Sequence, residues 1–160
     1  MFVRIKRING IDYAYLVENE WTPKGSRQNV TAYLGKVLKV QRQKITIQRL
    51  TGSNYNKLIN DLIETTLLDY GFQKQNQHPQ TYILNDITVD LLQMRTVHKH
   101  KPAVLALEQG HFCEQTIAEL IRFSKKENPE KTAVALASAL LQAGISISTE
   151  NMVALFESIA

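Results

Sequence analysis

Residues 2–17 read Phe-Val-Arg-Ile-Lys-Arg-Ile-Asn-Gly-Ile-Asp-Tyr-Ala-Tyr-Leu-Val. Apolar and polar side chains alternate on both sides of Asn9-Gly10, which is the spacing of a half-buried strand. Asn-Gly is the strongest short hairpin signal, because both central residues of a type I′ turn need a positive φ. The stretch therefore predicts two antiparallel strands, at residues 2–8 and 11–21.

Further strands are expected directly after this hairpin. Residues 22–26 form a loop, residues 27–34 predict a third strand that is interrupted at Gly35, and residues 36–50 predict a fourth strand in pieces. The first fifty residues are thus expected to fold as an antiparallel meander.

A long amphipathic helix is predicted next, over residues 55–70. Apolar side chains recur there at helical spacing. Thr51-Gly52 breaks the strand pattern, Ser53 is the expected N-cap, and Gly71 is placed to end the helix. The nearest partner for the apolar stripe of this helix is the N-terminal sheet.

The second half of the chain predicts a small hairpin and three helices. Residues 81–84 and 87–92 read as strands around Asn85-Asp86, and a further extended pair flanks the basic turn 98–102; a short helix over residues 89–94 is the alternative. Helices are predicted over residues 113–123, from Asn128-Pro129 to Gly144, and from Ser148 or Thr149 onward.

These elements define the expected fold class as α+β. The prediction is an N-terminal antiparallel β-meander packed on a long helix, a second small β-hairpin and a C-terminal helical bundle. Residues 1–50 are expected to form a basic β-ribbon or sheet. Residues 51–160 are expected to form a helical α+β region, either as one compact unit or as two closely packed subdomains.

Charge is distributed unevenly along the chain. The net charge is +4 at pH 7. Residues 1–57 carry eleven lysines and arginines against three acidic residues, a net charge of +8, whereas residues 58–160 carry a net charge of −4. A polyanion is the obvious partner for the basic part. The alternative is that these charges only keep an exposed sheet from aggregating.

The composition favours a cytoplasmic globular protein. Hydrophobic residues make up 44% of the chain, and no apolar run approaches the roughly 18 residues that span a bilayer. The N-terminus lacks the apolar stretch of a signal peptide. The single cysteine, Cys113, excludes an internal disulfide. We expect no cofactor, no metal and no membrane partner.

The candidate nucleic-acid-binding residues are the cations of the ribbon and one aromatic residue. They are Arg4, Lys6, Trp21, Lys24, Arg27, Lys36 and Lys39. Arg4 and Lys6 share one strand face. Cations near Tyr13, Tyr15 and Tyr33 suit phosphate contact combined with base stacking. For Tyr13 and Tyr15, however, the favoured interpretation is that they face the core as cross-strand pairs.

An ordered series of short motifs runs through the first forty residues. It comprises Phe2-Val3-Arg4, Lys6 before Asn9-Gly10, Tyr13-x-Tyr15-Leu16-Val17-Glu18, Trp21, Gly25-x-Arg27-Gln28 and Tyr33-Leu34-Gly35-Lys36. This series resembles the N-terminal leader of DDE-type insertion-sequence transposases and of related small uncharacterised prokaryotic proteins. Here Lys24 precedes Gly25 and Ser26 follows it, whereas the family pattern usually has a basic residue after the glycine.

The resemblance ends near Val40 and carries no catalytic residue. Transposition chemistry of this type needs three carboxylates that hold two metal ions on a much longer domain. The resemblance therefore implies contact with nucleic acid and no transposase activity.

Three other groups of residues give weaker indications of a functional site. His98-x-His100 and His111-x-Cys113 offer four zinc-type ligands at a spacing that matches no usual zinc pattern. Cys113 as a nucleophile needs a positioned histidine, and His111 is only two residues away. Residues 114–143 have the outline of a helix-turn-helix, but the second helix offers alanine, valine, leucine and serine to base edges. Packing is the favoured role for that pair of helices.

The sequence therefore favours a non-catalytic protein that binds nucleic acid, either RNA (or a ribonucleoprotein) or DNA, through a basic β-ribbon. The alternative is a protein-interaction module or regulatory subunit that docks through its acidic helical half. A homodimer would present two ribbons and raise avidity.

Overall fold

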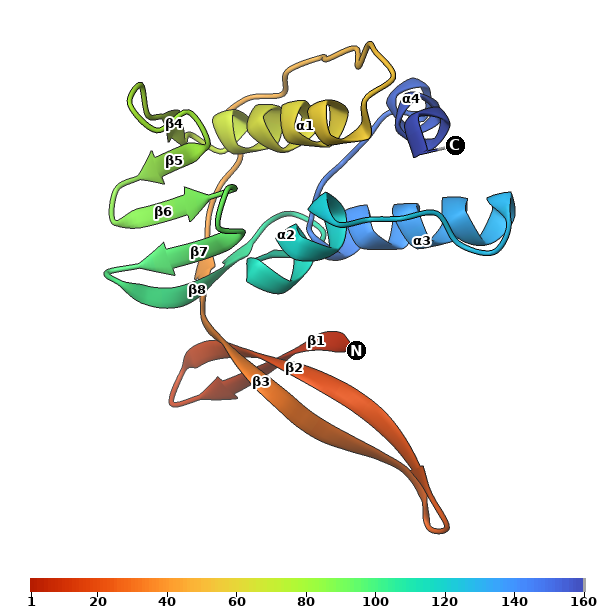
Figure 1. Ribbon diagram of the computed structural model, residues 1–160. Coiled ribbons are helices and arrows are strands. Elements are labelled where there is room, and N and C mark those ends of the chain that lie inside the picture. Colours follow the sequence, from red (N-terminus) through yellow and green to blue (C-terminus); the bar gives the residue numbers. More distant parts are fainter. Residues whose placement is uncertain (160) are drawn as a thin grey trace.

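The computed structural model describes residues 1–159. Within them the chain forms one mixed β-sheet and four helices, which confirms the α+β class (Figure 1). The strands are β1 (Phe2–Ile8), β2 (Ile11–Thr22), β3 (Gly25–Lys39), β4 (Gln73–Lys74), β5 (Thr81–Leu84), β6 (Ile87–Asp90), β7 (Arg95–His98), β8 (Lys101–Ala106) and β9 (His111–Phe112). The helices are α1 (Tyr55–Asp69), α2 (Glu114–Ile121), α3 (Pro129–Gln142) and α4 (Thr149–Ile159). None of these helices is long and apolar enough to cross a membrane.

The sheet joins two antiparallel meanders through one parallel contact. Its strand order is β1-β2-β3-β8-β7-β6-β5-β4, and β9 pairs with β8. β3 and β8 run parallel, from Lys36 opposite Ala103 to Lys39 opposite Ala106, and every other pair is antiparallel. The N-terminal ribbon, β1–β3, is thereby fixed to the remainder of the protein by the last residues of β3.

The first hairpin forms as its sequence predicts. Asn9 and Gly10 have φ values of 52° and 78°, as a type I′ turn requires. The register places Arg4 opposite Tyr15 and Lys6 opposite Tyr13. In Figure 1 the β2–β3 hairpin projects well beyond the body that carries the helices.

The prediction of separate third and fourth strands is wrong. β3 is continuous through Gly35 and ends at Lys39, and residues 40–54 contain no strand. Gly35 does not interrupt the strand because its φ of +132° lets the chain continue where the backbone of Pro102 approaches. A Cβ atom at this position would overlap the carbonyl group of Pro102.

Side chains from two helices hold the segment 40–54 in place of strand pairing. The buried amide of Asn151 accepts a hydrogen bond from Leu50 N at 2.9 Å and donates one to Gln48 O at 2.7 Å. Asp69, at the end of α1, binds Thr46 and Arg42. The segment thus has no strand partner, and its hydrogen-bond partners are the side chains of Asp69 and Asn151 and the backbone carbonyl of Asp69, all of which lie far away in the sequence.

The long helix forms at the predicted place but does not pack on the ribbon. Asn54, rather than Ser53, is its N-cap and accepts a hydrogen bond from Lys57 N at 3.3 Å. Gly71 follows its end with a φ of +93°. Its buried face lies in a core shared with β5, β6 and the other helices, because the segment 40–54 carries the chain away from the ribbon before α1 begins (Figure 1).

The predicted hairpin forms as β5 and β6, and the extended pair predicted around residues 98–102 forms as β7 and β8. Together with β4 they make one antiparallel meander. Val89 lies in β6, so the alternative of a helix over residues 89–94 is wrong. Lys99 and His100 have φ values of 50° and 67° and form the tight turn between β7 and β8. The C-terminal helices begin where predicted: Asn128 caps α3, accepting from Lys131 N at 2.8 Å, and the four helices pack on one another.

Asp69 couples the segment 40–54 to α1 in a pH-dependent way. Its buried carboxylate accepts hydrogen bonds from Thr46 N (2.9 Å) and Thr46 Oγ1 (2.6 Å), and it lies 3.4 Å from the Arg42 guanidinium. Burial alone would raise the pKa of Asp69, but the hydrogen bonds from Thr46 and Arg42 outweigh it and hold the pKa below its ordinary value of 3.8. A carboxyl whose folded pKa is lowered stabilises the fold above its unfolded pKa, and this contribution is lost as the pH falls through the folded pKa.

We therefore expect Asp69→Asn to lower the free energy of unfolding by about 1–3 kcal/mol at neutral pH. The difference from the unmodified protein should begin to shrink as the pH falls below about 3.8, where the unfolded chain takes up the proton, and should level off below the lowered pKa of folded Asp69, where both proteins carry a neutral group at this position. Urea unfolding at a series of pH values measures the effect. An equal difference at neutral and acidic pH would contradict it.

Candidate nucleic-acid interface

The ribbon has an inner face that closes a small core. Ala14, Leu16 and Leu34 point inward and are buried together with Val104 and Cys113. Val3 and Ile5 of β1 pack against this core. Residues of β1 and of β9 line a cavity of about 470 Å³. Its lining includes Phe2, Val3 and His111. This small core fixes which side chains of β1–β3 point outward.

The outer face carries three tyrosines in contact. Tyr15 lies opposite Tyr33 across the β2–β3 pair, with ring centroids 5.3 Å apart, and the Tyr13 ring centroid lies 6.4 Å from that of Tyr33. Tyr33 is 50% exposed, and Tyr13 and Tyr15 are half-buried. We refer to Tyr13, Tyr15 and Tyr33 as the tyrosine cluster.

The prediction that Tyr13 and Tyr15 face the core is wrong. Neither belongs to either hydrophobic core. Ala14 and Leu16 fill the inner face instead, and the alternation of side chains along β2 then directs both tyrosines outward.

Three of the predicted cations surround the tyrosine cluster. Lys6 lies opposite Tyr13 in β1 and Lys36 lies opposite it in β3, while Arg4 lies opposite Tyr15. Lys6 Nζ is 5.1 Å from the centroid of the Tyr15 ring, and Arg4 donates a hydrogen bond to Gln28 Oε1. All three cations are exposed, and none of them takes part in an ion pair within residues 1–159. Their charges are therefore free to meet an anion.

The other predicted residues lie elsewhere on the ribbon. Trp21 is 84% exposed near the tip of the β2–β3 hairpin, where Lys24 occupies the turn and Arg27 lies opposite Glu20. Lys39 is at the opposite end of β3, opposite Ala106. The structure thus groups Arg4, Lys6 and Lys36 and leaves a second group at the tip.

The predicted binding set omitted all three tyrosines of the cluster, and Tyr33 is the most exposed of them. Burial, with Tyr15 and Tyr13 close by, raises the pKa of Tyr33 above its ordinary value of 10.0. Its phenol is therefore neutral at physiological pH and does not repel phosphate. The available sequence signal was its alternation with the apolar Leu34, which places the two side chains on opposite faces of β3.

The zinc-type ligand set does not assemble. No group of three or more histidine, cysteine, aspartate or glutamate side chains in the described part of the chain is arranged to hold a metal ion. Cys113 is buried at the start of α2, and burial raises the pKa of its thiol, which disfavours the nucleophilic thiolate. Burial has the opposite effect on the histidine and lowers the pKa of His111.

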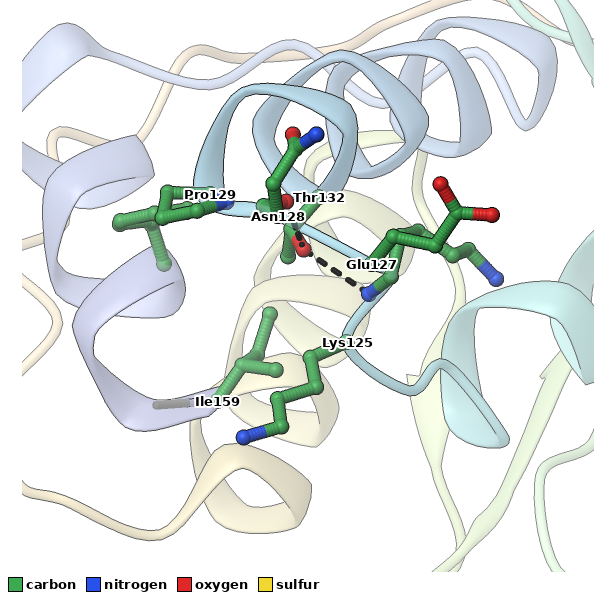
Figure 2. Close-up of a pocket in the computed structure, with 8 residues that line it drawn as sticks. Lys125, Glu127, Asn128, Pro129, Thr132 and Ile159 are labelled. Atoms are coloured by element: carbon green, nitrogen blue, oxygen red, sulfur yellow. Dashed lines mark hydrogen bonds between the residues drawn. The ribbon is translucent and has the colours of Figure 1, made fainter.

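A cavity of about 260 Å³ lies where α3 begins (Figure 2). Lys125, Glu127, Asn128 and Ile159 are among its lining residues. Asn128 caps the helix, and the hydroxyl of Thr132 accepts a hydrogen bond from Lys126 N at 2.9 Å. The polar groups of Asn128 and Thr132 are thus used in hydrogen bonds at the start of α3.

Comparisons with known proteins give no additional indication of function. No protein-family model, no curated protein and no solved structure matches this chain.

Proposed function

We propose that this protein is a non-catalytic nucleic-acid-binding protein whose interface is the outer face of the ribbon. The observation that carries the proposal is the group of exposed cations Arg4, Lys6 and Lys36 around the tyrosine cluster. Binding by such a surface is mainly electrostatic, because each lysine or arginine that meets a phosphate releases condensed counterions.

The shape of the ribbon supports the same proposal. A twisted antiparallel ribbon can lie along a nucleic-acid groove or strand and set side chains against phosphates. The projecting β2–β3 hairpin adds Trp21, Lys24 and Arg27 at a distance from the first group (Figure 1). Because the two groups are separate, both could contact a long polyanion at the same time, whereas a short one would reach only one group.

A salt titration tests this proposal. With about four to six phosphate contacts, the association constant should fall by roughly 50- to 300-fold for a labelled single strand, and by roughly 150- to 2000-fold for a duplex, between about 50 and 200 mM salt. Fluorescence anisotropy measures it with RNA and DNA, each single-stranded and duplex. Absence of binding to every oligonucleotide at low ionic strength would refute the proposal.

A further inference from the structure

We propose that the tyrosine cluster is a stacking platform for unpaired bases, so that the preferred ligand is single-stranded nucleic acid. This inference rests on the proposed function and names the class of nucleic acid that the same surface takes. Its basis is the position of the aromatic rings, whereas the proposed function rests on the cations.

The rings of the cluster are arranged so that they do not cover one another. Tyr15 and Tyr33 are inclined at 54°, and Tyr13 and Tyr33 at 43°. Rings tilted at these angles are not stacked face to face, and Lys6 Nζ lies over the Tyr15 ring at 5.1 Å from its centroid. Tyr33, in the middle of the cluster, keeps half of its surface in solvent.

Cations border the rings at the places where phosphates of a stacked strand would lie. Lys6 and Lys36 lie on the two sides of Tyr13, in β1 and β3, and Arg4 lies beside Tyr15. Aromatic side chains that take bases, together with cations that take the backbone, are the usual elements of single-strand binding sites. The raised pKa of Tyr33 keeps its phenol neutral, so it adds no opposing charge.

A duplex cannot use the rings in this way. Its bases stack on one another, and only their edges are presented in the grooves. Cations alone would bind a duplex as well as a single strand of the same charge. The tyrosines are therefore the feature that separates the two ligands.

The alternative role of the cluster is purely structural. Cross-strand aromatic pairs stabilise antiparallel sheets. If this were their only role, replacing Tyr33 would change the stability of the ribbon and would leave the ratio of single-strand to duplex affinity unchanged.

The test compares Tyr33→Leu and Tyr15→Leu with Tyr33→Phe. Leucine keeps apolar bulk without a flat ring, whereas phenylalanine keeps the ring. Anisotropy with oligouridine, oligothymidine and a mixed-sequence duplex of equal length should show single-strand affinity reduced by about 5- to 100-fold in the leucine variants. Duplex affinity should change by less than about twofold, and Tyr33→Phe should behave as the unmodified protein. If the leucine variants lose more affinity for oligouridine than for oligothymidine, RNA is identified as the source of the bases.

The possible failures are distinguishable. Equal binding of duplex and single strands, unaffected by the leucine variants, would overturn this inference and leave the proposed function intact. No binding of any oligonucleotide by the unmodified protein would overturn both. Should a leucine variant not fold, photocrosslinking of 5-iodouracil-substituted single strands to the unmodified protein decides: crosslinks at Tyr13, Tyr15 or Tyr33 support the platform, and crosslinks only at other residues refute it.

Discussion

Reversing the charge of Arg4, Lys6 and Lys36 together, by Arg4→Glu, Lys6→Glu and Lys36→Glu, is expected to lower nucleic-acid affinity by roughly 100-fold or more at low salt. Three phosphate contacts would be lost and three repulsive charges would be introduced. The slope of log K against log salt should flatten by about 0.7–0.9 for each lost contact. Anisotropy titration at several salt concentrations measures both quantities.

The matched control reverses three exposed cations that lie outside the ribbon, between α2 and α3. Arg122, Lys125 and Lys126 lie just after α2 and are exposed. Their replacement by glutamate changes the net charge by the same amount. A loss of affinity as large as that of the ribbon variant would show that net charge, rather than the ribbon surface, governs binding.

Gly35→Ala is expected to cause the largest loss of stability of any single methyl addition in the ribbon. Alanine there would adopt an unfavourable φ of +132° and would overlap the carbonyl of Pro102 in β8. The Cβ position is fixed by the β3 backbone and the carbonyl belongs to the β8 backbone, so neither can move aside without disturbing the parallel β3–β8 pairing. We expect the free energy of unfolding to fall by about 3 kcal/mol or more, measured by urea denaturation.

Gly25→Ala provides the control for this prediction. Gly25 has a similar φ of +113°, but a Cβ atom there would meet no atom within 4 Å. Only the backbone strain remains, so a loss of about 1–2 kcal/mol is expected. Equal losses in the two variants would contradict the close approach of β3 and β8.

The local elements of the fold were predictable because short-range chemistry specifies them. Asn9-Gly10 dictates a type I′ turn, and Asn128-Pro129 dictates a helix start, whatever surrounds them. The parallel pairing of β3 with β8 was not predictable in the same way. It joins residues that are more than sixty positions apart, and nothing in Lys36–Lys39 indicates which distant strand they will meet.

The candidate site shows a second limit of sequence reasoning. Period-two alternation predicts correctly that Tyr13 and Tyr15 share one face of β2, but it does not tell which face is inward. The inward face is the one that carries Ala14, Leu16 and Leu34. These residues form a core only together with Val104 of β8 and Cys113, which are distant in the sequence. The tyrosine cluster therefore became visible only in three dimensions.

The segment 40–54 shows a third limit. Alternating Ile45 and Ile47 suggested a strand, yet Asp69 and Asn151 supply the hydrogen bonds that a neighbouring strand would supply. Asn151 binds the backbone of Gln48 and Leu50, but no pattern in the sequence of residues 40–54 indicates that a distant asparagine will do so.

The outer face of β1–β3 is the proposed nucleic-acid interface. Amide chemical-shift mapping by NMR, with a single-stranded oligonucleotide added at low salt, tests it most directly. The shifted amides are expected to cluster around Arg4, Lys6, Tyr15, Tyr33 and Lys36. Shifts confined to the helices α1–α4, with the ribbon amides unchanged, would contradict it.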